Sequence, residues 1–81
     1  MRLDKYLKVT RLIKRRTIAN EACDAGRVLV NGKVARASLD VKVGDVIEIG
    51  LGARPLKVRV LQVSEHVTKD SAATHYEVVG E

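Results

Sequence analysis

The change of pattern that decides the fold lies in residues 18–35, which read IANEACDAGRVLVNGKVA. In the first half of this stretch, Ile18, Ala22 and Ala25 recur at the three- and four-residue spacing of one helical face, with Ala19 and Cys23 at its margin. Gly26 then supplies the left-handed position at which many helices end. The stretch therefore predicts a helix that stops at Gly26 and gives way to strands.

After the glycine, the apolar residues form two short runs, Val28–Val30 and Lys33–Ala35, joined by Asn31 and Gly32. Asn-Gly between such runs is typical of a type I′ turn, in which both central residues have positive φ. These residues predict a β-hairpin. Because the turn needs Asn31 whatever the function, a structural role and a binding role both remain open for this residue.

Two helices are predicted on the amino-terminal side of the hairpin. Leu3 and Leu7, four residues apart, indicate an amphipathic helix within residues 3–10. Thr17 is a residue type favoured as an N-cap, which predicts that a second helix spans residues 18–25. The two helices precede every predicted strand.

Three further strands follow the hairpin, over residues 46–49, 56–63 and 74–79, with loops at 50–53 and 64–73. The order predicts an α+β domain in which two short N-terminal helices pack on a small, mostly antiparallel sheet of about five strands. A chain of 81 residues has room for one such domain and a modest core.

Positive charge is concentrated near the amino end. The chain carries 15 Lys and Arg against 10 Asp and Glu. Residues 1–36 hold ten basic and three acidic residues, whereas residues 37–81 hold five basic and seven acidic residues. Such an uneven distribution favours a polyanionic partner. Membrane surfaces are polyanionic too, so charge alone does not select RNA.

Seven basic residues within the first sixteen form the main candidate binding group, opposed only by Asp4. They are Arg2, Lys5, Lys8, Arg11, Lys14, Arg15 and Arg16. Four are arginines, which suit two-point contact with phosphate. The alternative is an ordinary solvated charged face. Around the hairpin, Arg27 and Lys33 extend the candidate group, with Arg36 a further possible extension.

Asp4 has three interpretations. In the first helical turn its negative charge interacts favourably with the helix dipole. It is also placed to orient a neighbouring arginine or to contact a partner protein. The sequence favours the dipole role and leaves the other two open.

Aromatic residues are nearly absent, since Tyr6 and Tyr76 are the only ones. Proteins that bind single-stranded nucleic acids ordinarily stack bases on aromatic side chains. A nucleic-acid partner is therefore predicted to be folded RNA, contacted through its phosphates and shape. Tyr6 lies on the apolar face of the first predicted helix and is assigned to the core.

Catalytic, metal and cofactor chemistry find little support. His66 and His75 lie far in sequence from the single cysteine, Cys23, and no metal-ligand spacing or phosphate-binding glycine loop occurs. Cys23 is predicted to be a packed, reduced thiol of a cytoplasmic protein. The chain has no apolar segment long enough to span a membrane and no signal-peptide pattern. We expect neither an enzyme nor a membrane partner.

Residues 2–49 resemble the αL RNA-binding motif, first described in ribosomal protein S-four. The matching pieces are Arg2-Leu3-Asp4-Lys5-Tyr6-Leu7, Ala25-Gly26-Arg27-Val28, Val30-Asn31-Gly32-Lys33-Val34 and Val41-Lys42-Val43-Gly44-Asp45. The resemblance implies a single RNA-binding domain over residues 1–81, with its core at 2–49 and a β-strand extension at 50–81. Among freestanding versions the chain is most similar to the RqcP (YabO) family. The related heat-shock protein fifteen is longer, with a basic tail, whereas the tail here is acidic.

The RqcP resemblance implies a non-enzymatic factor in bacterial ribosome quality control. It would bind large-subunit rRNA and peptidyl-tRNA on the 50S ribosomal subunit and support alanine tailing with RqcH, and it would be a monomer when free. The implied rRNA contacts are led by Arg2 and Arg16. Lys5, Arg11, Lys14 and Arg15 form a second tier. The implied partner contacts are Asp4, Asn31 and Gly32. Two alternatives remain: a rescue factor like heat-shock protein fifteen, and a protein-interaction module with a basic face.

Overall fold

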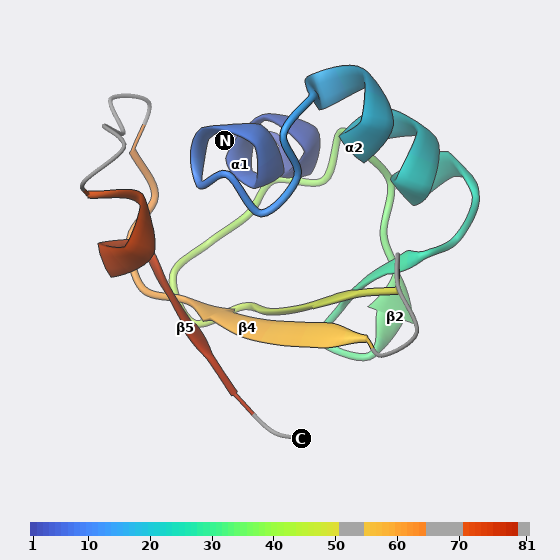
Figure 1. Cartoon of the computed structure of the whole chain (residues 1–81). Coiled ribbons are helices and arrows are strands. Elements are labelled where there is room, and N and C mark those ends of the chain that lie inside the picture. Colours follow the sequence, from blue (N-terminus) through green and yellow to red (C-terminus); the bar gives the residue numbers. More distant parts are fainter. Residues whose placement is uncertain (51–54, 65–70, 80–81) are drawn as a thin grey trace.

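Two helices lie across one face of a five-stranded sheet in the computed structural model (Figure 1). The structure describes residues 1–50, 55–64 and 71–79. The helices are α1 (Leu3–Val9) and α2 (Arg16–Asp24). The strands are β1 (Val28–Val30), β2 (Lys33–Val34), β3 (Val46–Ile49), β4 (Leu56–Val60) and β5 (Tyr76–Val78), and a 3-10 turn, η1 (Ala72–Thr74), precedes the last strand. The predicted fold class is confirmed.

All neighbouring strands pair antiparallel, in the order β2-β1-β3-β4-β5. One row of paired residues crosses the sheet through Val30, Ile47, Val58 and Val78. The first three are buried, because side chains of one row share a face and this face is covered by the helices. Val78 belongs to the same row but remains exposed on the edge strand.

The hairpin turn has the predicted geometry, with φ of 53° at Asn31 and 84° at Gly32. The Asn31 side chain also joins the turn to the start of β3. Its Oδ1 accepts a hydrogen bond from the Val46 N–H at 3.0 Å, and its Nδ2 donates to Asp45 Oδ1 at 3.1 Å. The structure therefore supports the structural role of Asn31.

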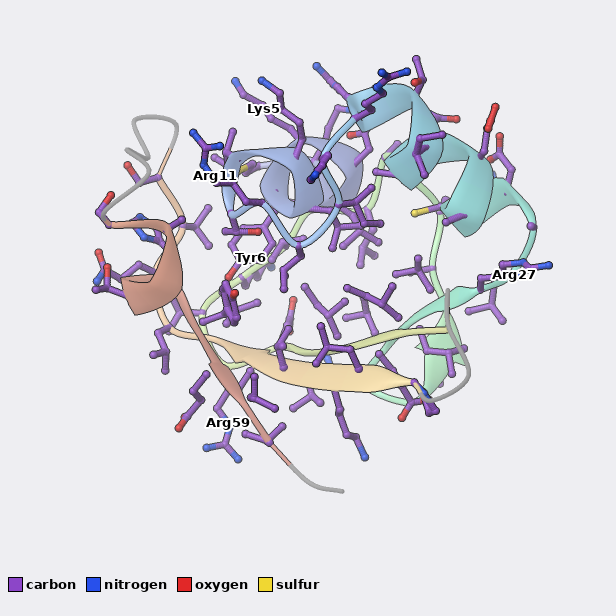
Figure 2. The ribbon with its side chains drawn as sticks, viewed as in Figure 1. Lys5, Tyr6, Arg11, Arg27 and Arg59 are labelled. Atoms are coloured by element: carbon purple, nitrogen blue, oxygen red, sulfur yellow. The ribbon has the colours of Figure 1, made fainter. Side chains whose placement is uncertain are left out.

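The core lies between the helical layer and the sheet. From α1 it receives Leu3, Tyr6 and Leu7, all fully buried. The Tyr6 hydroxyl donates a 2.8 Å hydrogen bond to the carbonyl of His75, which connects α1 to the segment before β5. The predicted core role of Tyr6 is confirmed, and Figure 2 shows the ring between α1 and the sheet.

The buried face of α2 is rotated toward the margin of the predicted apolar face. The buried residues are Ala19, Ala22 and Cys23, whereas Ile18 and Ala25 are exposed. The face is rotated because α2 packs closely against α1 and β1 through small side chains. The close approach of the α2 backbone to its neighbours decides which residues face inward. The hydrophobic pattern of the sequence does not predict this approach.

The helix boundary and the strand ends also differ from the prediction. The N-cap position of α2 is Arg15 rather than Thr17, and no side chain caps it. The fourth strand ends at Val60, and the last begins at Tyr76 because residues 72–74 form η1. Of the predicted loops, residues 51–53 and 65–70 lie outside the described residues.

Candidate nucleic-acid interface

Asp4 is the centre of a polar cluster that joins the two helices. Its side chain is only 2% exposed, yet its carboxylate accepts hydrogen bonds from four residues. Oδ1 accepts from Arg2 Nε at 3.2 Å and from the Lys5 backbone N–H at 2.8 Å. Oδ2 accepts from Arg16 Nε at 3.2 Å, from Asn20 Nδ2 at 3.4 Å and from Arg2 Nη2 at 3.5 Å. One carboxylate therefore holds an arginine from each helix.

The charge of Asp4 is stabilised by these donors. Burial alone would raise the pKa of the carboxyl, because it disfavours the charged form. Hydrogen bonds from the side chains of Arg2 and Arg16 and from the Lys5 backbone outweigh burial, and the pKa of Asp4 lies below its ordinary value. Asp4 is thus an anion at neutral pH.

The structure gives Asp4 two of its three predicted roles. It lies in the first turn of α1, where the helix dipole favours it, and it orients neighbouring arginines. Its contact with a partner stays a prediction. Such a buried carboxylate presents little surface of its own, so we assign it to positioning.

The seven cations near the amino end lie in the helical layer and form what we call the N-terminal basic surface. One precedes α1, two lie on α1, three lie in the connection between the helices, and one begins α2. These are Arg2, Lys5, Lys8, Arg11, Lys14, Arg15 and Arg16. Figure 2 shows Lys5 and Arg11 projecting from this layer away from the sheet. The seven therefore lie on the same side of the sheet.

Two kinds of cation make up the N-terminal basic surface. Arg2 and Arg16 are half-exposed and use Nε on Asp4. Lys8, Lys14 and Arg15 are exposed, and within residues 1–50, 55–64 and 71–79 no carboxylate lies within ion-pair distance of them. The surface thus combines two oriented guanidinium groups with cations whose charge is not compensated locally.

Arg11 has an unusual backbone conformation. Its φ is 62°, and its N–H donates to the Lys8 carbonyl at 3.0 Å at the end of α1. This is the left-handed position that glycine ordinarily fills after a helix. Arg11 therefore ends α1 and directs an exposed cation outward (Figure 2).

The remaining predicted residues lie apart from this surface. Arg27 projects at the other side of the molecule, beyond α2 (Figure 2), and Lys33 starts β2. Asn31 and Gly32 form the hairpin turn and have side-chain or backbone roles there. The structure does not gather these four residues with the basic surface, and their binding roles stay predictions.

Asn20 and Arg36 extend the site along α2. Two adjoining hollows share Arg2 and Asn20. One reaches Arg16, and the other runs between α2 and residues 34–38, where Arg36 lines it. The role of Asn20 was missed, although its spacing of four from Arg16 puts both on one face of a helix.

The opposite face of the sheet has its charges paired. Arg59 projects below the sheet, away from the helices (Figure 2), and its Nη1 lies 3.2 Å from Glu77 Oε2. Lys57, two residues away on the same face, lies 3.7 Å from Glu48 Oε1. The described cations of this outer face are neutralised by cross-strand partners.

Among the described residues, Cys23 and His75 show no arrangement for chemistry. Cys23 is buried, and burial raises the pKa of its thiol to about 11. His75 is buried with Nδ1 2.9 Å from the Ser71 carbonyl, and His66 lies outside the described residues. Within those residues no three potential metal ligands form a group, and no helix is long and apolar enough to cross a membrane.

Comparison with known proteins agrees with this architecture. Residues 1–47 match the S4 domain. The structure of Vibrio cholerae Heat Shock Protein 15, described as trimeric, superposes with a TM-score of 0.91 at 28% identity, covering 98% of this chain and 81% of that one. The fold and its basic helical layer therefore define an S4-domain RNA-binding protein.

Relatives that match along nearly their whole length identify the family within the S4-domain proteins. The RQC P-site tRNA stabilizing factor of Streptococcus pneumoniae is 52% identical over 81 residues, 100% of this chain and 92% of that protein. The protein of the same name from Halalkalibacterium halodurans is 54% identical over 78 residues, 96% of this chain and 89% of that protein. The chain belongs to this RqcP family, which confirms the resemblance seen in the sequence.

Proposed function

We propose that the protein is a non-enzymatic RNA-binding factor of ribosome quality control that stabilises tRNA on the large ribosomal subunit. The names of its relatives support the role with tRNA. The observation that carries the RNA contact is the Asp4 cluster, which holds Arg2 and Arg16 together within the N-terminal basic surface. The protein acts where ribosomes are, in the cytoplasm.

Phosphate contact follows from how the guanidinium groups are held. Arg16 donates Nε to Asp4, whereas Arg2 donates Nε and, at 3.5 Å, Nη2. The remaining guanidinium nitrogens of both side chains can donate to a second anion. Because Asp4 already restricts both side chains, less rotamer freedom is lost when a phosphate binds. Lys8, Lys14 and Arg15 add the longer-range attraction that increases the rate of encounter.

The finer biological role is part of the same proposal. Contacts with large-subunit rRNA and peptidyl-tRNA keep the tRNA in place while RqcH supports alanine tailing of the stalled chain. The free protein is a monomer in this proposal. It differs in this respect from the heat-shock relative whose structure is trimeric.

Salt dependence of RNA binding tests the phosphate mechanism. If about four phosphates are contacted on duplex-like RNA, log affinity falls with log salt at a slope of roughly −3 to −4. Arg16→Ala is expected to flatten the slope by about one unit. Fluorescence anisotropy with an rRNA stem-loop, measured from low to high salt, gives both values.

Arg59→Ala is the matched control, because it removes an arginine of similar exposure from the outer face of the sheet. It should leave the slope unchanged. A flat salt response of the wild-type protein would contradict phosphate binding. Ribosome association that survives neutralising Arg15 and Arg16 but is lost on changing the outer face would favour the protein-interaction alternative.

A further inference from the structure

Ile18 is an exposed apolar residue within the N-terminal basic surface. It lies in the first turns of α2 and is 42% exposed, whereas the neighbouring Ala19 is fully buried. Single exposed apolar residues are common on protein surfaces and by themselves indicate nothing. What distinguishes Ile18 is its surroundings.

Ile18 lines a hollow of about 290 Å³ together with Ile13, Lys14 and Arg15. Ile13 is 5% exposed and gives the hollow a second apolar wall. The other two lining residues are exposed cations with no carboxylate nearby among the described residues. The hollow is thus apolar inside and positively charged at its rim.

The size and chemistry of the hollow restrict its occupant. Pockets that enclose a whole drug-sized molecule measure roughly 300–1,000 Å³, so this hollow suits a single small group. The group must offer an apolar surface and be attached to negative charge. A nucleobase within an RNA strand has both properties, because phosphates flank it on either side.

We propose that this hollow receives one unpaired nucleobase of the RNA that the basic surface binds. The base packs against Ile13 and Ile18, while Lys14 and Arg15 contact the flanking phosphates. This inference rests on the proposed function and adds a substrate class to it. Bases inside an A-form duplex are stacked and inaccessible to such a hollow, so the target carries a bulge or a loop at this position.

A protein segment is the less suitable occupant. It would have to supply an apolar side chain between two acidic ones, in a region where the other exposed side chains also attract polyanions. Arg11 precedes the lining residues in sequence, Arg16 lies between two of them, and both arginines belong to the same surface. Continuity with that surface favours RNA, and a protein occupant is an outcome that the experiment below detects.

Two RNA hairpins closed by the same stable tetraloop test the proposal. The stem of one contains a single bulged nucleotide, and the stem of the other is fully paired. Anisotropy titrations at two salt concentrations give the Kd of each. We expect the wild-type protein to prefer the bulged probe about five- to tenfold, the scale set by burying part of one aliphatic side chain. Ile18→Ser should reduce that preference to about twofold or less and leave the salt slope unchanged, because no charge is removed.

Two further variants make the test specific. Val78→Ser removes an aliphatic side chain that is 65% exposed on β5, outside the basic surface, and should keep the full preference. Ile18→Ala favours the helix and should lose most of the preference, so the proposal stays testable even if serine disturbs α2. Thermal unfolding of each variant confirms that it is folded.

The outcomes separate this inference from the proposed function. A wild-type protein that binds neither probe would overturn both. Equal wild-type binding of the two probes, or an unchanged preference in both Ile18 variants, would overturn only the base-binding hollow. Normal RNA binding by Ile18→Ser combined with lost ribosome association would assign the hollow to a protein instead.

Discussion

Arg11 combines an unfavourable backbone conformation with an exposed cation, and this combination is informative. A left-handed conformation costs a non-glycine residue roughly 1–2 kcal/mol. We expect Arg11→Gly to leave the free energy of unfolding unchanged or to raise it by up to about 1 kcal/mol, while RNA affinity falls. Urea unfolding and RNA titration of the same variant measure the two effects.

Arg11→Ala serves as the control for this prediction. It removes the same charge but keeps a side chain at the left-handed position, so it should lose affinity without any gain in stability. RNA affinity of Arg11→Gly equal to that of the wild-type protein, at every salt concentration, would remove Arg11 from the binding surface.

Asp4 makes stability depend on pH in a defined direction. Its pKa is lower in the folded protein than its ordinary value of 3.8, so the ion pairs with Arg2 and Arg16 contribute fully above that value. Their contribution is lost as the pH falls through the folded pKa. Asp4→Asn should be less stable than the wild-type protein by about 1–2 kcal/mol at pH 7, and the difference should shrink in acid.

Urea unfolding from pH 7 to pH 2.5 checks this expectation. The pKa of Asp40 is lowered as well, by a hydrogen bond and the charge of the N-terminal amine. Subtracting the Asp4→Asn curve from the wild-type curve leaves the contribution of Asp4 alone. A difference that stays constant down to the lowest pH would mean that Asp4 is not a paired anion.

The elements differ in how far the sequence determined them. The hairpin was predictable because Asn31-Gly32 satisfies a local requirement for positive φ at two successive residues. The inward face of α2 was not, because Ala19 rather than Ile18 faces the core where the helices approach closely. The Asp4 cluster depends on how α1 and α2 cross, and no sequence period encodes that crossing.

The close packing of α2 against α1 and β1 predicts that a larger side chain at a buried position of α2 destabilises the protein. Ala19→Leu adds three carbons to a buried position and should lower the free energy of unfolding by about 1–3 kcal/mol. Ala25→Leu makes the same change at an exposed position at the end of α2 and should have little effect. Equal effects of the two substitutions on denaturant midpoints would contradict the observed packing of α2.

At the scale of the whole molecule, the motif core at residues 2–49 and the extension that follows it share one hydrophobic core. Val58 and Val60 of the extension are buried in the same core as α1, and the Tyr6 hydroxyl binds the His75 carbonyl. Tyr6→Phe should lower the free energy of unfolding by about 1 kcal/mol. The loss is small because the N–H of Leu61 also donates to that carbonyl, at 2.8 Å.

The same unfolding experiment tests whether the domain is one unit. For the wild-type protein and for Tyr6→Phe we expect a single transition, in which circular dichroism and tyrosine fluorescence change together. Two separate transitions in either protein would show that residues 2–49 and the extension unfold independently.

The ion pairs on the outer face of the sheet affect how the protein approaches its target by diffusion. They join Arg59 to Glu77 and Lys57 to Glu48. Among the described residues, these two pairs carry no net charge on the outer face, whereas the N-terminal basic surface lies on the helical side, so positive charge is displaced toward the helices. In the field of a polyanion this displacement of charge produces a torque that turns the helices forward before collision. A larger share of diffusional encounters then begins with the helices toward the RNA, which increases the association rate.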